Sequence, residues 1–208
     1  RDIAYQLKEG SAVFGSTFGI FLYRKANVLI LKQLAPNEVV GVYSAAEKVI
    51  KGFQSIVAPA AQALFPHLSQ RFKDKSDVEN INLLKKISLP FSAVLALLSG
   101  AVYVFAPWIS DLLCGVGMRD CIPLIRIMTL VIFFGEINYL IGILGLINMN
   151  RQKQFFNSVM ITGVFSVIFI LIFAGKYGAT AAACSMSLSE MLLTMLCVGC
   201  LFKIRGRK

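Results

Sequence analysis

The sequence is poor in charged residues and in histidine. Only 15% of its 208 residues are charged, and His67 is the one histidine, whereas soluble domains carry about 25% charged residues. The five cysteines are scattered, and the C-x-x-C pair Cys197 and Cys200 has no second pair or histidine beside it. Zinc centres, redox centres and Ser/His or Cys/His catalytic sites need several such groups close together. We therefore expect no cofactor, no metal and no catalytic residue.

What the sequence has instead is long apolar blocks. Hydrophobic residues make up 57% of the chain, and blocks of about 20 residues are long enough to cross a ~30 Å hydrocarbon layer as helices. The sequence therefore predicts an all-α, polytopic membrane protein with one six-helix unit over residues 1–208. The expected spans are 10–34, 41–68, 89–109, 122–147, 155–174 and 179–202.

The one long polar segment is 69–88, between the second and third spans. Ser76 and Glu79 fit a helix capping box, and apolar residues then recur at helical spacing: Val78, Ile81, Leu84 and Ile87. This pattern predicts an amphipathic helix lying on the cytoplasmic membrane surface. An ordinary loop helix is the alternative.

The net charge of +10 would suggest a nucleic-acid partner in a soluble protein. Here most cations fall in the short segments between spans. Thirteen lysines and arginines lie on the side that holds both termini and 69–88, whereas Arg119 and Lys176 alone lie on the other side. By the positive-inside rule both termini should be cytoplasmic. We expect membrane lipids as partners, no nucleic acid, and no signal peptide, because the start of the chain lacks a cleavage pattern.

Polar residues inside the first two spans are the main functional signal. Arg24, Lys25 and Asn27 stand near the middle of the first span. On the second span Tyr43, Glu47, Lys51 and Ser55 recur every four residues and share one helix face, with Lys48 about 100° around the helix. A charge at the bilayer centre costs at least about 2.5–3.5 kcal/mol, so such groups usually face protein or a water-filled path. Snorkelling of Arg24 and Lys25 to a headgroup is the alternative.

Charged residues of four helices fall at the same depth. Arg24, Lys51, Glu136 and Glu190 each lie ten to fourteen residues from the predicted outer end of their span, which is about 15–21 Å at 1.5 Å per residue. With the neighbouring charges counted, the spans hold four cations against three carboxylates: Arg24, Lys25, Lys48 and Lys51 against Glu47, Glu136 and Glu190. This surplus of cations favours an anion such as a phosphate or diphosphate. Structural ion pairs, for example between Arg24 and Glu136, are the alternative.

Short motifs give the chain a family resemblance. They are VLIL at 28–31, GVYSAAEK at 41–48, ALFPHLS at 63–69, NRQ at 150–152 and YGA at 177–179. In this order and spacing the chain resembles polysaccharide or O-antigen flippases (Wzx type) of the multidrug/oligosaccharidyl-lipid/polysaccharide exporter superfamily. Such flippases usually have two six-helix lobes, and this chain resembles the second, C-terminal lobe.

The resemblance implies a function and partners. It implies a bacterial inner-membrane flippase that moves undecaprenyl-diphosphate-linked O-antigen or polysaccharide repeat units by alternating access, with a proton or a sodium ion as the candidate coupling ion. The implied partners are the lipid-linked oligosaccharide, an N-terminal six-helix lobe and polysaccharide polymerase machinery. Without the first lobe, transport by this chain alone is not expected.

The resemblance also gives the polar residues roles. Arg24, Lys25, Lys48 and Lys51 would attract the diphosphate, with Glu47 beside Lys51. Asn27, Tyr43, Gln54 and Asn138 would bind sugar hydroxyls. Burial favours the protonated form of a carboxyl group, so Glu136 or Glu190 would carry a coupling proton.

Three other functions stay open. A drug/cation antiporter of the same superfamily would favour an acidic, aromatic cavity. A membrane-embedded transferase would need an acid/base pair near the membrane interface, which the central carboxylates suit poorly. A non-transporting structural subunit would use the same charges only to hold its helices together.

Overall fold

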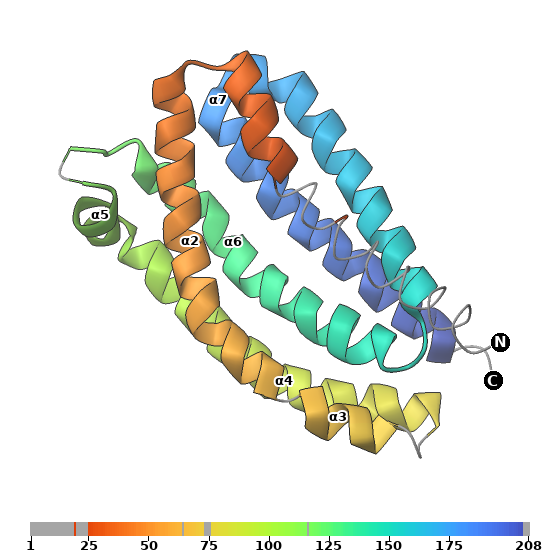
Figure 1. Ribbon diagram of the computed structural model, residues 1–208. Helices are drawn as coiled ribbons and strands as arrows, with labels where there is room; N and C mark the ends of the chain where they lie inside the picture. Colours follow the sequence, from red (N-terminus) through yellow and green to blue (C-terminus); the bar gives the residue numbers. More distant parts are fainter. Residues whose placement is uncertain (1–18, 20–24, 64, 73–75, 116, 206–208) are drawn as a thin grey trace.

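The computed structural model describes residues 19, 25–63, 65–72, 76–115 and 117–205. Within these ranges the chain is helical between short connections and has no strand (Figure 1), which confirms the all-α prediction. Residues 25–34 are helical. The further helices are α2 (Asn37–Ala63), α3 (Phe65–Phe72), α4 (Asp77–Val104), α5 (Ala106–Ile109), α6 (Cys121–Asn138) and α7 (Gln152–Arg205), with π-helical stretches η1 (Ser110–Cys114) and η2 (Tyr139–Ile147).

Three of the described helices are long and apolar enough to cross a membrane, judged by length and composition. They are Asp77–Val104, Cys121–Ile147 and Gln152–Arg205. The third turns back on itself at Gly178, where φ is 51° and ψ is −125°. Such a backbone conformation is open to glycine and strained for other residues. Figure 1 shows the two halves of α7 running antiparallel, so each half holds one of the spans expected at 155–174 and 179–202.

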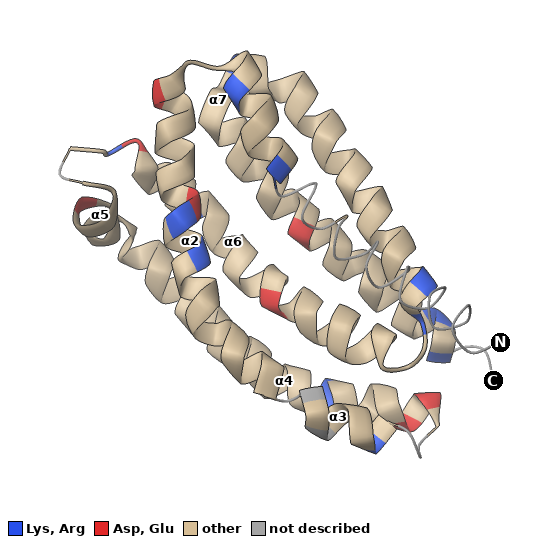
Figure 2. Ribbon diagram, viewed as in Figure 1, with Lys and Arg blue, Asp and Glu red and all other residues tan. Residues whose placement is uncertain are grey.

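The first two expected spans are described in part. Most of 10–34 lies outside the described residues. The second, 41–68, is carried by α2 and α3, and α2 includes Pro59 within its 27 residues. Figure 2 shows that α2 also bears neighbouring basic and acidic positions along its length.

The second half of the polar segment 69–88 belongs to α4, which continues without a break into the apolar length of that helix. Ser76 forms the expected capping box: its hydroxyl accepts from the Glu79 N–H, and its own N–H donates to Glu79 Oε2 at 3.0 Å. From Asp77 the helix runs on past residue 88 without a break. Ile81 and Leu84 are buried, and Leu84 lies so close to Gly145 that a Cβ there would come within 2.7 Å of it. The buried residues Ile81 and Leu84 on the apolar side of this segment therefore pack against the same chain, and Leu84 packs on η2.

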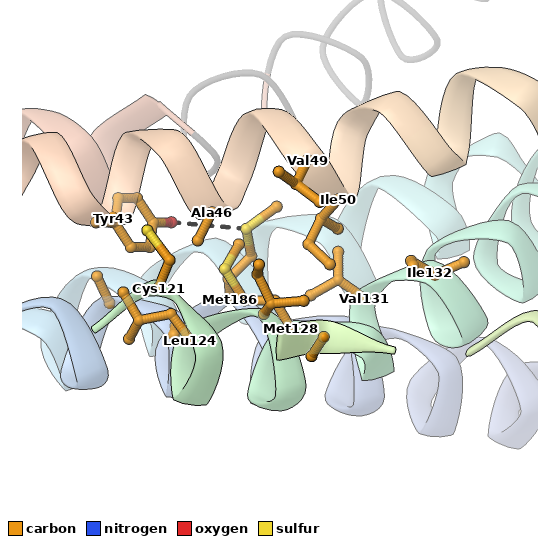
Figure 3. Packing of buried hydrophobic residues seen from close by; sticks show 14 of the residues in the cluster. Tyr43, Ala46, Val49, Ile50, Cys121, Leu124, Met128, Val131, Ile132 and Met186 are labelled. Carbon is orange, nitrogen blue, oxygen red and sulfur yellow. Dashed lines mark hydrogen bonds between the residues drawn. The ribbon is translucent and has the colours of Figure 1, made fainter. Parts of the chain in front are cut away.

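The rod formed by α6 and η2 lies at the centre of the bundle, where it packs on α2, α4 and α7. Figure 3 shows one part of this core, in which Tyr43 and Ile50 of α2 face Met128 and Ile132 of α6. The Tyr43 hydroxyl points to the sulfur of Met186 on α7, at 3.6 Å. Apolar burial of this kind, at about 25 cal/mol per Å² in water, is weaker as a driving force between helices in lipid, where close packing matters more.

The outside of the bundle is also apolar. Leu89 and Leu97 of α4 expose 74% and 76% of their surface, and Trp108 of α5 exposes 67%. Contiguous apolar surface of this extent is rare on soluble monomers. It suits a helix bundle surrounded by hydrocarbon or by more protein.

At one end of the bundle the turn between η2 and α7 meets the start of α4. Asn150 takes a left-handed conformation (φ 60°), which asparagine tolerates better than most residues. Arg151 then reaches Asp77, with 3.1 Å between Nη2 and Oδ2. The pair is partly exposed, so we expect it to contribute little to stability.

Candidate functional site

A polar cavity opens where α2, α6 and α7 meet. It has a volume of about 270 Å³, and we call it the central polar cavity. Its polar lining comes from three helices and η2: Gln54, Ser55, Glu136, Asn138, Tyr139 and Glu190. The apolar lining includes Ile143, Phe155 and Leu193. No described lysine or arginine lines this cavity, so its chemistry is acidic, amide-rich and partly aromatic.

The most connected group in the cavity is Asn138. Its amide donates to Glu190 Oε2 at 2.7 Å and to the Glu190 carbonyl oxygen at 3.0 Å. Its own oxygen accepts from the Thr194 hydroxyl at 2.7 Å. Glu190 is 1% exposed and Asn138 is 5% exposed, so these bonds are shielded from water and link α6 to the second half of α7. A short hydrogen bond that is shielded from water is stronger than the same bond exposed to solvent.

Two carboxylates line the same cavity. Glu136 lies on α6, two residues before Asn138, and is 6% exposed. Glu136 lies in the last turn of α6, just before η2, and Glu190 lies within the second half of α7. Figure 2 shows one acidic position on α6 and another on α7 in this part of the bundle. Ionisable groups inside an apolar bundle are costly and usually mark a path for an ion or a substrate.

Gln54 connects α2 to this group. Its amide donates to the Val131 carbonyl oxygen of α6 at 3.1 Å, and its side chain is buried. A backbone carbonyl inside a helix normally accepts from the N–H four residues on, and it retains a second lone pair for a side chain such as this. Gln54 therefore holds α2 against α6 at the edge of the cavity.

The cations expected at the site lie elsewhere. Lys51 forms an ion pair with buried Glu47 one turn before it. Lys48 is exposed and borders a separate depression of about 490 Å³, lined also by Ser44 and Leu113. Lys25 is exposed on the helix at 25–34, and Arg24 lies outside the described residues.

Asn27 and Tyr43 lie in helix contacts rather than in the cavity. The Asn27 oxygen accepts from the hydroxyls of Ser166 and Ser185, at 3.2 and 3.3 Å. These two serines, 3.1 Å apart, come from the two halves of α7. Asn27 thus fastens the helix at 25–34 to both halves of α7.

The structure therefore brings together Gln54, Glu136, Asn138 and Glu190 among the expected site residues, and places Lys25, Lys48 and Lys51 outside their cavity. It adds Thr194, Tyr139 and Phe155 to the neighbourhood of the site. Thr194 lies four residues after Glu190, so helical spacing alone was a signal for it. No sequence pattern pointed to Phe155. It lines the cavity because its ring packs against Gly142 on η2, and that contact joins two different helices.

A chain of long apolar helices around buried amides and carboxylates is a helical membrane protein with a polar interior. Comparison with known proteins shows what the chain is similar to. Residues 1–72 match the family described as "Polysaccharide biosynthesis protein". Over 196 residues the chain is 24% identical to a protein of Escherichia coli (strain K12) named "Putative O-antigen transporter", covering 94% of this chain and 47% of that protein.

A protein of Shigella dysenteriae with the same name is 22% identical over 195 residues, which cover 94% of this chain and 48% of that protein. The chain thus spans about half the length of these curated relatives. No solved structure matches it. Together the matches make the chain similar to a polysaccharide biosynthesis family over residues 1–72 and to proteins named as O-antigen transporters over most of its length. Bacterial relatives of this kind and several apolar helices indicate a multi-pass bacterial membrane protein.

Proposed function

We propose that this chain is one six-helix lobe of a flippase for undecaprenyl-diphosphate-linked O-antigen or polysaccharide repeat units. In this proposal it works by alternating access in the bacterial inner membrane, with both termini in the cytoplasm and a second lobe facing it. The relatives named as O-antigen transporters support the polysaccharide as cargo. The polar interior in an apolar bundle supports transport rather than a purely structural role.

The observation that carries the proposal is the exposed cationic face. Lys25 and Lys48 are exposed, and Lys51 keeps 38% of its side-chain surface accessible beside Glu47. Charges at these positions would be costly against acyl chains, so the face requires protein or water next to it. A second lobe placed there would enclose a cation-lined cavity, and we assign Arg24, which lies outside the described residues, to the same set of cations. Such a cavity suits a diphosphate headgroup.

In the same proposal the central polar cavity is the coupling site. Glu136 and Glu190 share it, and one of them would carry an inward-moving proton or sodium ion. Gln54 and Asn138 hold the helices that present these carboxylates. The substrate would then bind at the cationic face and the ion in the central polar cavity. Helix α2 contributes residues to both places.

The test is O-antigen display in a strain that depends on the complete protein. Lys48→Ala, Lys51→Ala and Arg24→Ala should each strongly reduce long-chain lipopolysaccharide on gels while the protein level in membranes stays normal. The matched control is Lys153→Ala, since Lys153 is an exposed cation at the start of α7 outside this face. Normal display in all three variants would refute the cationic face as the substrate surface.

A drug/cation antiporter is the second candidate, and one observation favours it. The central polar cavity has two carboxylates with Tyr139 and Phe155 and no described cation in its lining, which suits a cationic, aromatic compound. An antiporter predicts that loss of the protein raises sensitivity to cationic drugs and leaves O-antigen display intact. The flippase predicts the reverse, so one deletion strain separates the two.

A further inference from the structure

A second groove lies far along the bundle from the cationic face, between the first turns of α4 and the last turns of α7. Its volume is about 200 Å³. Most of its lining is apolar: Ile81, Leu84, Ile141, Val198, Leu201 and Phe202. The groove is thus a hydrocarbon-like surface formed by α4, α7 and Ile141 of η2.

Two cations stand at the rim of this groove. Lys85 of α4 and Arg205 of α7 both line it and are exposed. The Lys85 ammonium lies 5.5 Å from the centre of the Phe202 ring, a cation–π distance. Among the described residues no carboxylate forms an ion pair with either cation, in contrast to the pairs of Lys51 and Arg151.

Each of these cations stands next to the polar end of an apolar stretch. Lys85 comes just before the apolar length of α4, which begins at Ile87 and includes exposed Leu89. Arg205 comes just after the apolar length of α7, which ends at Phe202. The apolar length of α4 thus begins, and that of α7 ends, beside the same groove. Both cations lie just outside these apolar lengths. Basic pockets between helices at this level are where anionic lipid headgroups bind.

We propose that this groove binds an anionic phospholipid of the surrounding bilayer. Its headgroup phosphate lies between Lys85 and Arg205, and one acyl chain lies along the apolar wall formed by Leu84, Val198 and Leu201. The two cations supply the charge that the phosphate needs, and the wall supplies the hydrocarbon surface that the chain needs. None of these residues lines the central polar cavity, so the site does not depend on what the protein transports.

The first experiment measures lipid binding to the complete purified protein. Phosphatidylglycerol and cardiolipin are titrated against phosphatidylcholine, with bound lipid counted by native mass spectrometry. Lys85→Gln and Arg205→Gln should each weaken binding of the anionic lipids about fivefold, the effect expected for one basic residue at a membrane surface. The matched controls are Lys86→Gln and Lys203→Gln, exposed neighbours that do not line the groove, and they should change binding less than twofold. If all four variants lose the same affinity for anionic lipids, binding depends on the general positive charge of the surface and not on the groove. That result would overturn the proposal.

The second experiment tests the groove itself. Val198→Phe fills it and leaves both cations in place, so it should reduce binding of phosphatidylglycerol about as strongly as Lys85→Gln does. Lipid-free thermal unfolding shows whether this variant is folded, and Ser88→Phe replaces it if it is not. Unchanged binding in the folded, filled variant refutes an acyl chain in the groove. Binding of undecaprenyl phosphate without binding of phosphatidylglycerol would assign the groove to a transport substrate and refute the phospholipid.

Discussion

Replacing Asn138 with alanine tests whether the hydrogen bonds around Glu190 hold α6 and α7 together. The change removes two donated bonds, at 2.7 and 3.0 Å, and the bond accepted from Thr194. A bond to a charged group contributes about 1.5–3 kcal/mol in soluble proteins. Bonds between membrane helices average about 0.6 kcal/mol and reach about 1.7 kcal/mol. Because Glu190 is fully buried, we expect a loss toward the upper end, about 1–2 kcal/mol.

The measurement is thermal unfolding of the purified protein in detergent. For a domain of this size about 1 kcal/mol corresponds to a shift of roughly 2–4 °C in melting temperature. Thr194→Val should cost less than Asn138→Ala, because it leaves both bonds from Asn138 to Glu190 intact. The matched control is Asn148→Ala, at the end of the same helical rod, where the amide bonds only to Leu144 of its own turn. If Asn148→Ala and Asn138→Ala destabilise the protein equally, the network is not what joins these helices.

Two further changes test the packing and the coupling proposal. Gly142→Ala should destabilise the protein by about 1–3 kcal/mol, because its Cβ would clash with the Phe155 ring. Gly199→Ala, whose Cβ would meet no atom beyond its own helical turn within 4 Å, should be neutral or stabilising by up to about 1 kcal/mol. Equal thermal shifts in the two variants would contradict the close approach at Gly142. Glu136→Gln or Glu190→Gln should abolish proton-dependent transport into vesicles with little change in protein level, while Glu38→Gln, at the exposed start of α2, should leave it intact. Transport with an unaltered dependence on the proton gradient in both cavity variants would exclude these carboxylates as the coupling groups.

Features set by neighbouring residues could be predicted from the sequence. The apolar blocks predicted helices, the Ser76–Glu79 spacing predicted the capping box, and the four-residue spacing of Glu47 and Lys51 predicted that the two could pair. In each case the partners lie within one or two turns of a helix, so the helical repeat alone brings them together.

Features that depend on the packing of distant helices could not be predicted. The contact of Asn27 with Ser166 and Ser185 joins residues 139 and 158 positions apart, and no local pattern specifies it. Depth along each span placed Lys51 and Glu136 at one level, but depth says nothing about the direction in which a side chain points around its helix. The segment at 69–88 looked like a surface helix because its apolar stripe had no visible partner, and that partner is Gly145 with its neighbours on η2.

The one-residue turn at Gly178 has a mechanical consequence. The two halves of α7 are joined by so short a turn that they can hardly slide along each other. A few helical turns away, Ser166 and Ser185 bond to each other and to Asn27 and so hold the two halves together a second time. Residues 152–205 should therefore travel as one rigid piece whenever the protein changes shape. Bending is then left to joints where the regular helix is already interrupted, at Phe105 and near Gly115 and Gly117, whose φ angles are positive.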